Sequence, residues 1–254
     1  MAITPEISWG ILPDRCLDRV VVCSPHFDDA ALGAAHLLIA HKGSTVITLF
    51  GGPPPRYPDP PTEWDALGGF RSGDYVVAVR REEDRAAMEV LDAEPVWLDF
   101  VDHQYLDRSE RATPDEMAKS LGAALDEAAP SAVFLPMGLA NPDHVATHDA
   151  GALLAVERPE ITWFCYEDSG YKHIPGMLAW RIAKLFRGDL WPTPMIVPTL
   201  VDHERKRAAI ECYRSQLGPL NRDHALGARI GGSVPEQFWV LAPPPPGWER
   251  MREM

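Results

Sequence analysis

Short runs of apolar residues alternate with longer amphipathic segments along most of this chain of 254 residues. Apolar or β-branched runs of about four to eight residues are typical of buried strands, and apolar positions spaced three and four apart predict helices. Strands are expected at residues 19–23, 45–50, 95–100, 132–136 and 161–166. Helices are expected between them at residues 31–41, 79–91, 114–128 and 145–155, with a later one at 202–216.

This alternation of strands and helices indicates βαβ units and therefore a largely parallel sheet. We predict the α/β class, with a Rossmann-like three-layer fold in which helices flank a mostly parallel central sheet. The length suits a single domain, expected to span residues 1–254.

Three segments break the pattern. The proline-rich stretch "GGPPPRYPDPPTEWDALGGF" at residues 51–70 is expected to lack regular structure, because proline removes a backbone donor and fixes φ. It is interpreted either as a disordered insertion or as a lid over a site. The stretch "FRGDLWPTPMIVPTL" at 186–200 is expected to be an irregular link, and the tail "APPPPGWERMREM" an exposed terminus.

The charge balance narrows the range of partners. The net charge of −13 offers no basic surface for nucleic acid or an anionic membrane. A small-molecule partner is expected, and the sequence leaves the oligomeric state open. No apolar run approaches the roughly 18 residues of a spanning helix. The N-terminus lacks the features of a signal peptide, so a cytoplasmic location is expected.

The first candidate site follows the first strand, in "VVVCSPHFDDAALGAAHLL". Ligands of open α/β sheets bind outside the carboxyl ends of the strands. His26 and Asp29 are three residues apart and can converge on one cation, which leaves Asp28 to take a proton from water. The alternative is that Asp28 or Asp29 caps the helix that follows.

The second candidate site follows another strand, in "LPMGLANPDHVATHDAGALL". His144 and His148 are four residues apart and share one helix face. Either histidine completes a set of two histidines and one aspartate, which leaves metal positions open for water and substrate. The alternative is a pair of surface histidines.

The two motifs together resemble the LmbE/PIG-L family of metal-dependent N-deacetylases. That family carries a P-H-x-D-D signature, here "SPHFDD", and an x-P-D-H motif, here "NPDHVATH". The resemblance covers about residues 20–154 and includes Arg80 in "RREEDRAAMEVLDA" and Asp102 in "LDFVDHQYL". It implies that Arg80 and Asp102 bind the sugar, although Arg80 and Glu83 could instead form an ion pair on a helix surface.

The resemblance also implies the catalytic roles. His26, Asp29 and His144 become ligands of Zn²⁺, with another divalent metal such as Fe²⁺ as the alternative, and Asp28 becomes the general base. Asn141 stands where some relatives have a histidine that stabilises the tetrahedral intermediate. That role passes to the metal alone, to the Asn141 amide or to His148.

The expected function is therefore metal-dependent hydrolysis of an N-acyl group, most simply acetyl, from an amino sugar or its conjugate. Candidate substrates are a thiol-precursor glycoside, an aminoglycoside or glycopeptide intermediate of secondary metabolism, and a chitooligosaccharide. One alternative is an amidase that acts on mycothiol-like S-conjugates. Another, from a different class, is a non-catalytic sugar- or nucleotide-binding α/β module.

Overall fold

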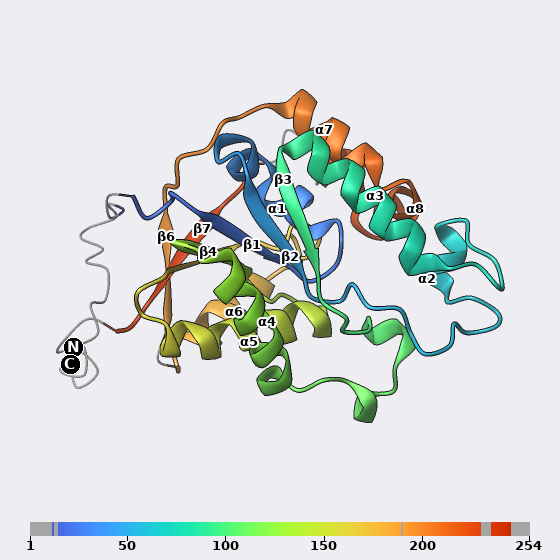
Figure 1. The fold of residues 1–254 in the computed structure, drawn as a ribbon, viewed down its shortest axis with the longest axis horizontal. Helices are drawn as coiled ribbons and strands as arrows, with labels where there is room; N and C mark the ends of the chain where they lie inside the picture. Colours follow the sequence, from blue (N-terminus) through green and yellow to red (C-terminus); the bar gives the residue numbers. More distant parts are fainter. Residues whose placement is uncertain (1–11, 13–14, 189, 230–234, 245–254) are drawn as a thin grey trace.

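A seven-stranded sheet forms the centre of the computed structural model, which describes residues 12, 15–188, 190–229 and 235–244. Among these residues the strand order is β3-β2-β1-β4-β5-β7-β6. The strands β1 to β5 run parallel, whereas β7 is antiparallel to both β5 and β6 (Figure 1). The bounds are β1 Val20–Ser24, β2 Ser44–Thr48, β3 Ala93–Trp97, β4 Ala132–Pro136, β5 Thr162–Tyr166, β6 Trp191–Met195 and β7 Phe238–Ala242.

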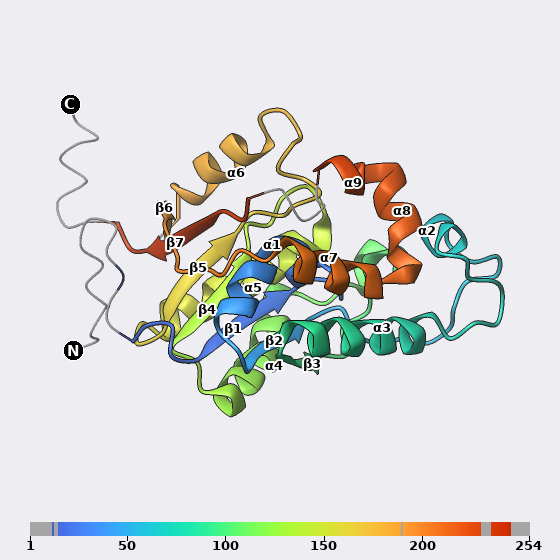
Figure 2. The same ribbon diagram turned by 90° about the horizontal axis from the view of Figure 1, so that it is seen from above.

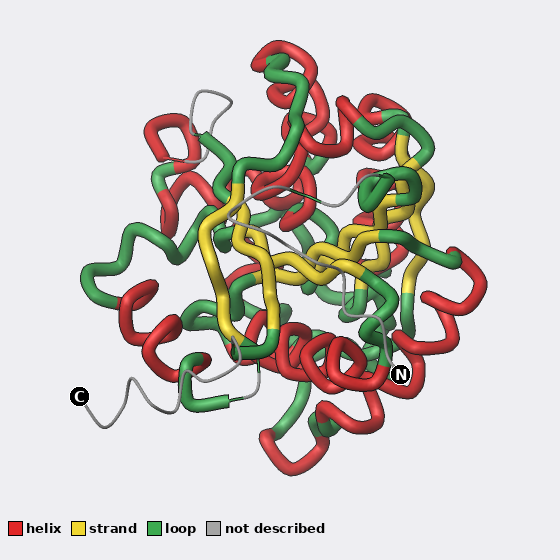
Figure 3. The backbone as a smooth tube through the Cα atoms, turned by 90° about the vertical axis from the view of Figure 1, so that its left-hand side faces the viewer, coloured by secondary structure: helices red, strands yellow, loops and turns green. Residues whose placement is uncertain are grey.

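Helices cover both faces of this sheet (Figures 2 and 3). The alternation of side chains along β1 directs Val20 and Val22 into one apolar layer and Val21 and Cys23 into the other. The first layer packs under α1, α3 and α7, and the second under α4 and α5. The helices are α1 Asp29–Ala40, α2 Glu63–Leu67, α3 Val76–Leu91, α4 Pro114–Ala128, α5 Pro142–Glu157, α6 Met177–Leu185, α7 His203–Cys212, α8 Arg214–His224 and α9 Leu226–Arg229.

The predicted three-layer α/β architecture is therefore confirmed. All five predicted strands form, and α4 begins and ends at the predicted residues. Its start is well defined because Thr113 and Glu116 form a capping box and Pro114 occupies the first turn.

Three local predictions need correction. Residues 186–200 are not wholly irregular, because they contain β6, whose Pro192 and Pro194 are accommodated at the sheet edge. Residues 51–70 contain the short helix α2, capped by the Thr62 side chain. The helix predicted at 202–216 is two helices that meet at Tyr213. Most of the tail predicted as an exposed terminus lies outside the described residues, and its first residue, Ala242, ends β7.

Helix α1 is interrupted in its middle, where Ala34 departs from helical geometry with φ −141° and ψ 20°. The buried Lys206 ammonium donates a hydrogen bond to the Leu32 carbonyl at 2.9 Å and pairs with the Glu236 carboxylate at 2.8 Å. That carboxylate in turn accepts hydrogen bonds from the backbone N–H groups of His36 and Leu37. Residues from distant parts of the chain thus satisfy the backbone groups at the interruption.

The described part of the chain contains no helix that is both long enough and apolar enough to span a bilayer.

Candidate active site

A cavity of about 280 Å³ lies at the carboxyl edge of the parallel strands. The loops after β1, β3 and β4 all contribute to its wall, which the parallel register brings to the same edge. Residues from both candidate sites of the sequence therefore lie together. The lining includes His26, Asp28 and Asp29 from the first, Asn141 and His144 from the second, and Asp102 and His103 from the loop after β3.

His26, Asp29 and His144 form one of two groups of potential metal ligands among the described residues, and His26, Asp102, His103 and Asp143 form the other. Oδ2 of Asp29 lies 3.3 Å from Nδ1 of His26 and 3.2 Å from Nε2 of His144. One donor atom from each residue lies within 4.8 Å of the other two. Two imidazoles and one carboxylate in this arrangement are the donor set that zinc accepts in sites that keep positions open for water and substrate.

The outward-facing nitrogen of each imidazole contacts a further carboxylate. Nε2 of His26 lies 3.0 Å from Oδ2 of Asp143, and Nδ1 of His144 contacts Asp168. Such carboxylate partners orient metal-binding histidines and make them better ligands. Although burial opposes the shift, Asp29 and Asp168 raise the pKa of His144 to about 9. The excess of carboxylates at this site is a charge that a divalent cation would offset.

Asp28 lies beside this group without serving as a helix cap. It occupies the N-cap position of α1, but its side chain makes no capping hydrogen bond, and the Ala30 N–H donates to Oγ of Ser24 instead. Asp29 accepts a hydrogen bond from the backbone of His26 at 2.9 Å. The capping alternative thus does not explain either carboxylate. Burial and the nearby Asp29 raise the pKa of Asp28 to about 7.

The structure separates the two residues considered for stabilising the intermediate. Asn141 lines the cavity, but its Oδ1 accepts a hydrogen bond from the Asp143 backbone and its Nδ2 donates to the Tyr171 hydroxyl. His148 does not line the cavity. Its buried ring contacts the Pro136 carbonyl, and burial lowers the pKa of His148 to about 4. Of the two histidines four residues apart, it is therefore His144 that joins His26 and Asp29.

Arg80 and Asp102 both line the cavity. Nη2 of Arg80 lies 2.8 Å from Oδ1 of Asp65, and both side chains of this ion pair are buried. Arg80 therefore pairs with Asp65 and not, as the alternative held, with Glu83 on a helix surface. The carboxylate of Asp102 accepts two hydrogen bonds from Gln104, one from the backbone at 2.9 Å and one from the side chain at 2.7 Å. Both side chains are thus fixed before any ligand arrives.

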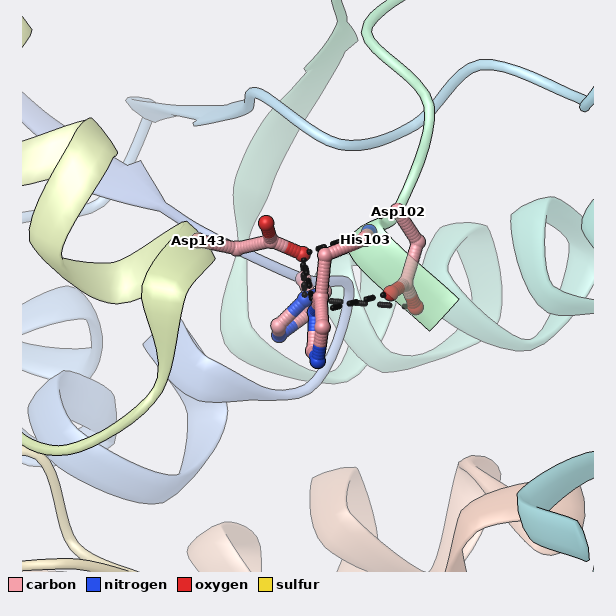
Figure 4. Close-up of side chains that lie close together, drawn as sticks. Asp102, His103 and Asp143 are labelled. Atoms are coloured by element: carbon pink, nitrogen blue, oxygen red, sulfur yellow. Dashed lines mark hydrogen bonds and ion pairs between the residues drawn. The ribbon is translucent and has the colours of Figure 1, made fainter. Parts of the chain in front are cut away.

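Three features of this site lie outside the two sequence motifs. Asp168 is the second residue after β5, and a carboxylate after a strand of the same parallel sheet was a usable signal. His103 adjoins Asp102 and lies between Asp102 and Asp143 (Figure 4). A further part of the cavity lining comes from the C-terminal half, for which no motif was available. It consists of Gly170, Tyr171, Gln216, Leu220 and His224. Trp64 also lines the cavity, and its indole N–H donates a hydrogen bond to the Gln216 side chain.

Comparisons with known proteins place the chain in a family and a fold. The family model described as "PIG-L: GlcNAc-PI de-N-acetylase" matches residues 21–155. No curated protein sequence matches the chain. The crystal structure of A40926 pseudoaglycone deacetylase is 26% identical with a TM-score of 0.68, over 89% of this chain and 98% of that one. A deacetylase triple mutant from the teicoplanin biosynthetic pathway is 25% identical with a TM-score of 0.68, over 90% of this chain and all of that one.

A third solved structure shares only the fold. It is 4-carboxy-2-hydroxymuconate hydratase from Pseudomonas putida, 18% identical with a TM-score of 0.52, over 90% of this chain and 97% of that one. Because a hydratase shares this architecture, the reaction has to be argued from the residues of the cavity.

Proposed function

Because this chain belongs to the PIG-L family, we propose that it is a metal-dependent hydrolase that removes an N-acyl group, most simply acetyl, from an amino sugar or an amino-sugar conjugate. The observation that carries this proposal is the convergence of His26, Asp29 and His144 at one cavity, with Asp28 beside them and not spent as a helix cap.

His26, Asp29 and His144 would hold the metal. Zinc is the preferred ion for two imidazoles and one carboxylate, and Fe²⁺ is the alternative. When bound, such an ion polarises a carbonyl group and makes a water molecule more acidic. The paired carboxylates Asp143 and Asp168 support this assignment, because they hold both imidazoles in one orientation.

Asp28 acts as the general base in this proposal. Its pKa, raised to about 7 by burial and by Asp29, suits a group that accepts a proton near neutral pH and later returns it. As water attacks the amide carbonyl, Asp28 takes its proton. When the C–N bond breaks, Asp28 delivers that proton to the departing amine.

The substrate class follows from the cavity and the neighbours. A volume of about 280 Å³ lies just below the range of about 300–1,000 Å³ for small-molecule sites and suits one sugar ring with its acyl group. Arg80 and Asp102 offer polar contacts to the hydroxyl groups, and Trp64 and Tyr171 offer aromatic surface. Two similar proteins, at 26% and 25% identity, are the deacetylase of A40926 pseudoaglycone and a deacetylase of the teicoplanin biosynthetic pathway. We therefore favour an N-acylated amino sugar carried on a larger conjugate.

The test combines metal analysis with amine release. The purified protein is loaded with Zn²⁺ or Fe²⁺ and incubated with a panel that contains N-acetylglucosaminides, N-acylated glycopeptide sugars and S-conjugated amides. The proposal expects about one metal ion per chain and release of a free amine from an N-acyl amino sugar. Preference for S-conjugated amides would favour the amidase alternative. Failure to bind any divalent metal would favour a non-catalytic binding module.

A further inference from the structure

One oxygen of Asp143 holds two histidines of the cavity. Its Oδ2 lies 3.0 Å from Nε2 of His26 and 2.9 Å from Nδ1 of His103, and it accepts a hydrogen bond from the His103 backbone at 3.1 Å. The Asp143 side chain is only 4% exposed. His26 already belongs to the proposed ligand set, whereas His103 has no role in it.

The two nitrogens of the His103 ring differ in their surroundings, because Nδ1 contacts two carboxylates and Nε2 does not. The ring lies between the carboxylates of Asp102 and Asp143, and Oδ1 of Asp102 is 3.3 Å from the same Nδ1 atom (Figure 4). Within the part of the chain that the structure describes, no protein group forms a hydrogen bond with Nε2 of His103. The side chain is 29% exposed and lines the cavity together with His26 and Asp28. Nε2 is therefore the atom that a bound substrate can reach.

The surrounding charge makes this atom a hydrogen-bond donor. The hydrogen bonds to Asp102 and Asp143 raise the pKa of His103 to about 9, and the two carboxylates at Nδ1 favour the imidazolium form of the ring. An imidazolium carries a proton on both nitrogens, and with Nδ1 engaged by the carboxylates the proton on Nε2 is the one left for a ligand in the cavity.

Such a donor would favour amide hydrolysis alongside the metal ion, because negative charge develops on the carbonyl oxygen as water adds to the carbon. The two side chains first considered for this task are occupied elsewhere: Asn141 by Asp143 and Tyr171, and His148 by the Pro136 carbonyl outside the cavity. His103 comes from a different loop, but it reaches the same cavity.

We propose that His103 is a catalytic residue that donates a hydrogen bond from Nε2 to the amide oxygen as this oxygen becomes negatively charged, and that Asp143 is the residue that positions it. This inference rests on the proposed function. No proton leaves His103: the C–O bond forms as the proton of water passes to Asp28, and the C–N bond breaks as Asp28 protonates the nitrogen.

The test compares His103→Gln and His103→Ala with the parent enzyme, all saturated with Zn²⁺ and assayed on the N-acetyl amino sugar that the parent hydrolyses fastest. We expect kcat to fall about 10²- to 10³-fold in His103→Ala, the loss typical of one oxyanion donor, with KM changed less than about threefold. His103→Gln should lose less, because its amide remains a donor. His41→Gln, with its ring on the Pro198 carbonyl at the far end of α1, is the matched control and should keep the parent kcat.

A second substrate separates this role from a structural one. A trifluoroacetyl group stabilises the negative oxygen by itself, so the loss of kcat in His103→Ala should be smaller on the N-trifluoroacetyl sugar than on the N-acetyl sugar. A merely misfolded site would lose both activities equally, which would overturn the inference.

The remaining outcomes are distinguishable. A parent enzyme that hydrolyses no N-acyl amino sugar would overturn the proposed function and this inference with it. An active parent with His103→Ala within twofold of its kcat would overturn the inference alone. A fall in the metal content of His103→Ala would assign the residue to metal binding and would also overturn it.

Discussion

Asp168 holds Nδ1 of His144 and thereby turns Nε2 of the same ring toward the cavity. Both side chains are almost fully buried, so the orientation of the ring is fixed by protein and not by solvent. Asp168 lies outside the 21–155 segment that the family model matches, yet it controls one of the three proposed metal ligands.

Asp168→Asn should therefore weaken metal binding without removing a ligand. The amide is a poorer partner for the imidazole than the carboxylate, and loss of such a partner typically weakens metal affinity by about 10- to 100-fold. Competition between the protein and a chromophoric zinc chelator measures this affinity. Asp126→Asn, a change at an exposed carboxylate on α4 that pairs with Arg158, should leave the affinity unchanged and serves as the control. Equal affinities in the two variants would show that Asp168 does not orient a ligand.

Asp28→Asn should separate metal binding from turnover. The variant keeps all three proposed ligands, so its metal content should match that of the parent. It loses the base, and general-base catalysis typically contributes about 10²- to 10⁴-fold. His144→Ala removes a proposed ligand, so this variant should lose its metal and, as a consequence, its activity. Elemental analysis beside amine-release kinetics distinguishes the two, and an Asp28→Asn enzyme with the parent rate would contradict the assignment of the base.

Asp143 and His103 should behave as one unit in kinetics. If Asp143 acts on the reaction through His103, Asp143→Asn should lower kcat, and adding His103→Ala to it should cost much less than His103→Ala costs in the parent. The measurement is a double-mutant cycle on kcat at saturating Zn²⁺, because Asp143→Asn also weakens the hold on His26. Strictly additive losses would mean that the two residues act separately.

The buried ion pair at the interruption of α1 should contribute strongly to the free energy of unfolding. The ammonium of Lys206 and the carboxylate of Glu236 are 1% and 3% exposed. Removing one partner of such a pair leaves an uncompensated buried charge, so Lys206→Met should lower the free energy of unfolding by about 3–5 kcal/mol. Lys42→Met breaks the exposed pair with Asp92 and should leave the free energy of unfolding nearly unchanged. Urea denaturation of the two variants provides the comparison, and equal losses would contradict a structural role for the buried pair.

The features that the sequence predicted well depend on neighbours along the chain. The strand β1, the turn that carries His26 and Asp29, and the capping box of Thr113 and Glu116 all express short-range preferences. The meeting of the first cluster with His144 was also accessible, because parallel strands place their carboxyl ends at one edge.

The features that the sequence did not predict depend on contacts between distant segments. β6 contains two prolines and forms only because β7 pairs with it along the edge. The role of His103 was hidden because its partner Asp143 is 40 residues further along the chain. Gln216 and His224 carry no local signal for a binding site and reach the cavity only through the packing of α8.

Because two separate parts of the chain form the cavity wall, substrate preference can change independently of the reacting groups. The proposed metal ligands and the base come from the turn after β1 and from the first turns of α1 and α5, whereas Gln216 and Leu220 of the cavity lining come from α8. Substitutions on α8 can reshape the space for the sugar and its aglycone while the reacting groups keep their positions. Chimaeric proteins that exchange residues 214–224 between deacetylases of this fold are thus a rational route to new substrate preferences with unchanged chemistry.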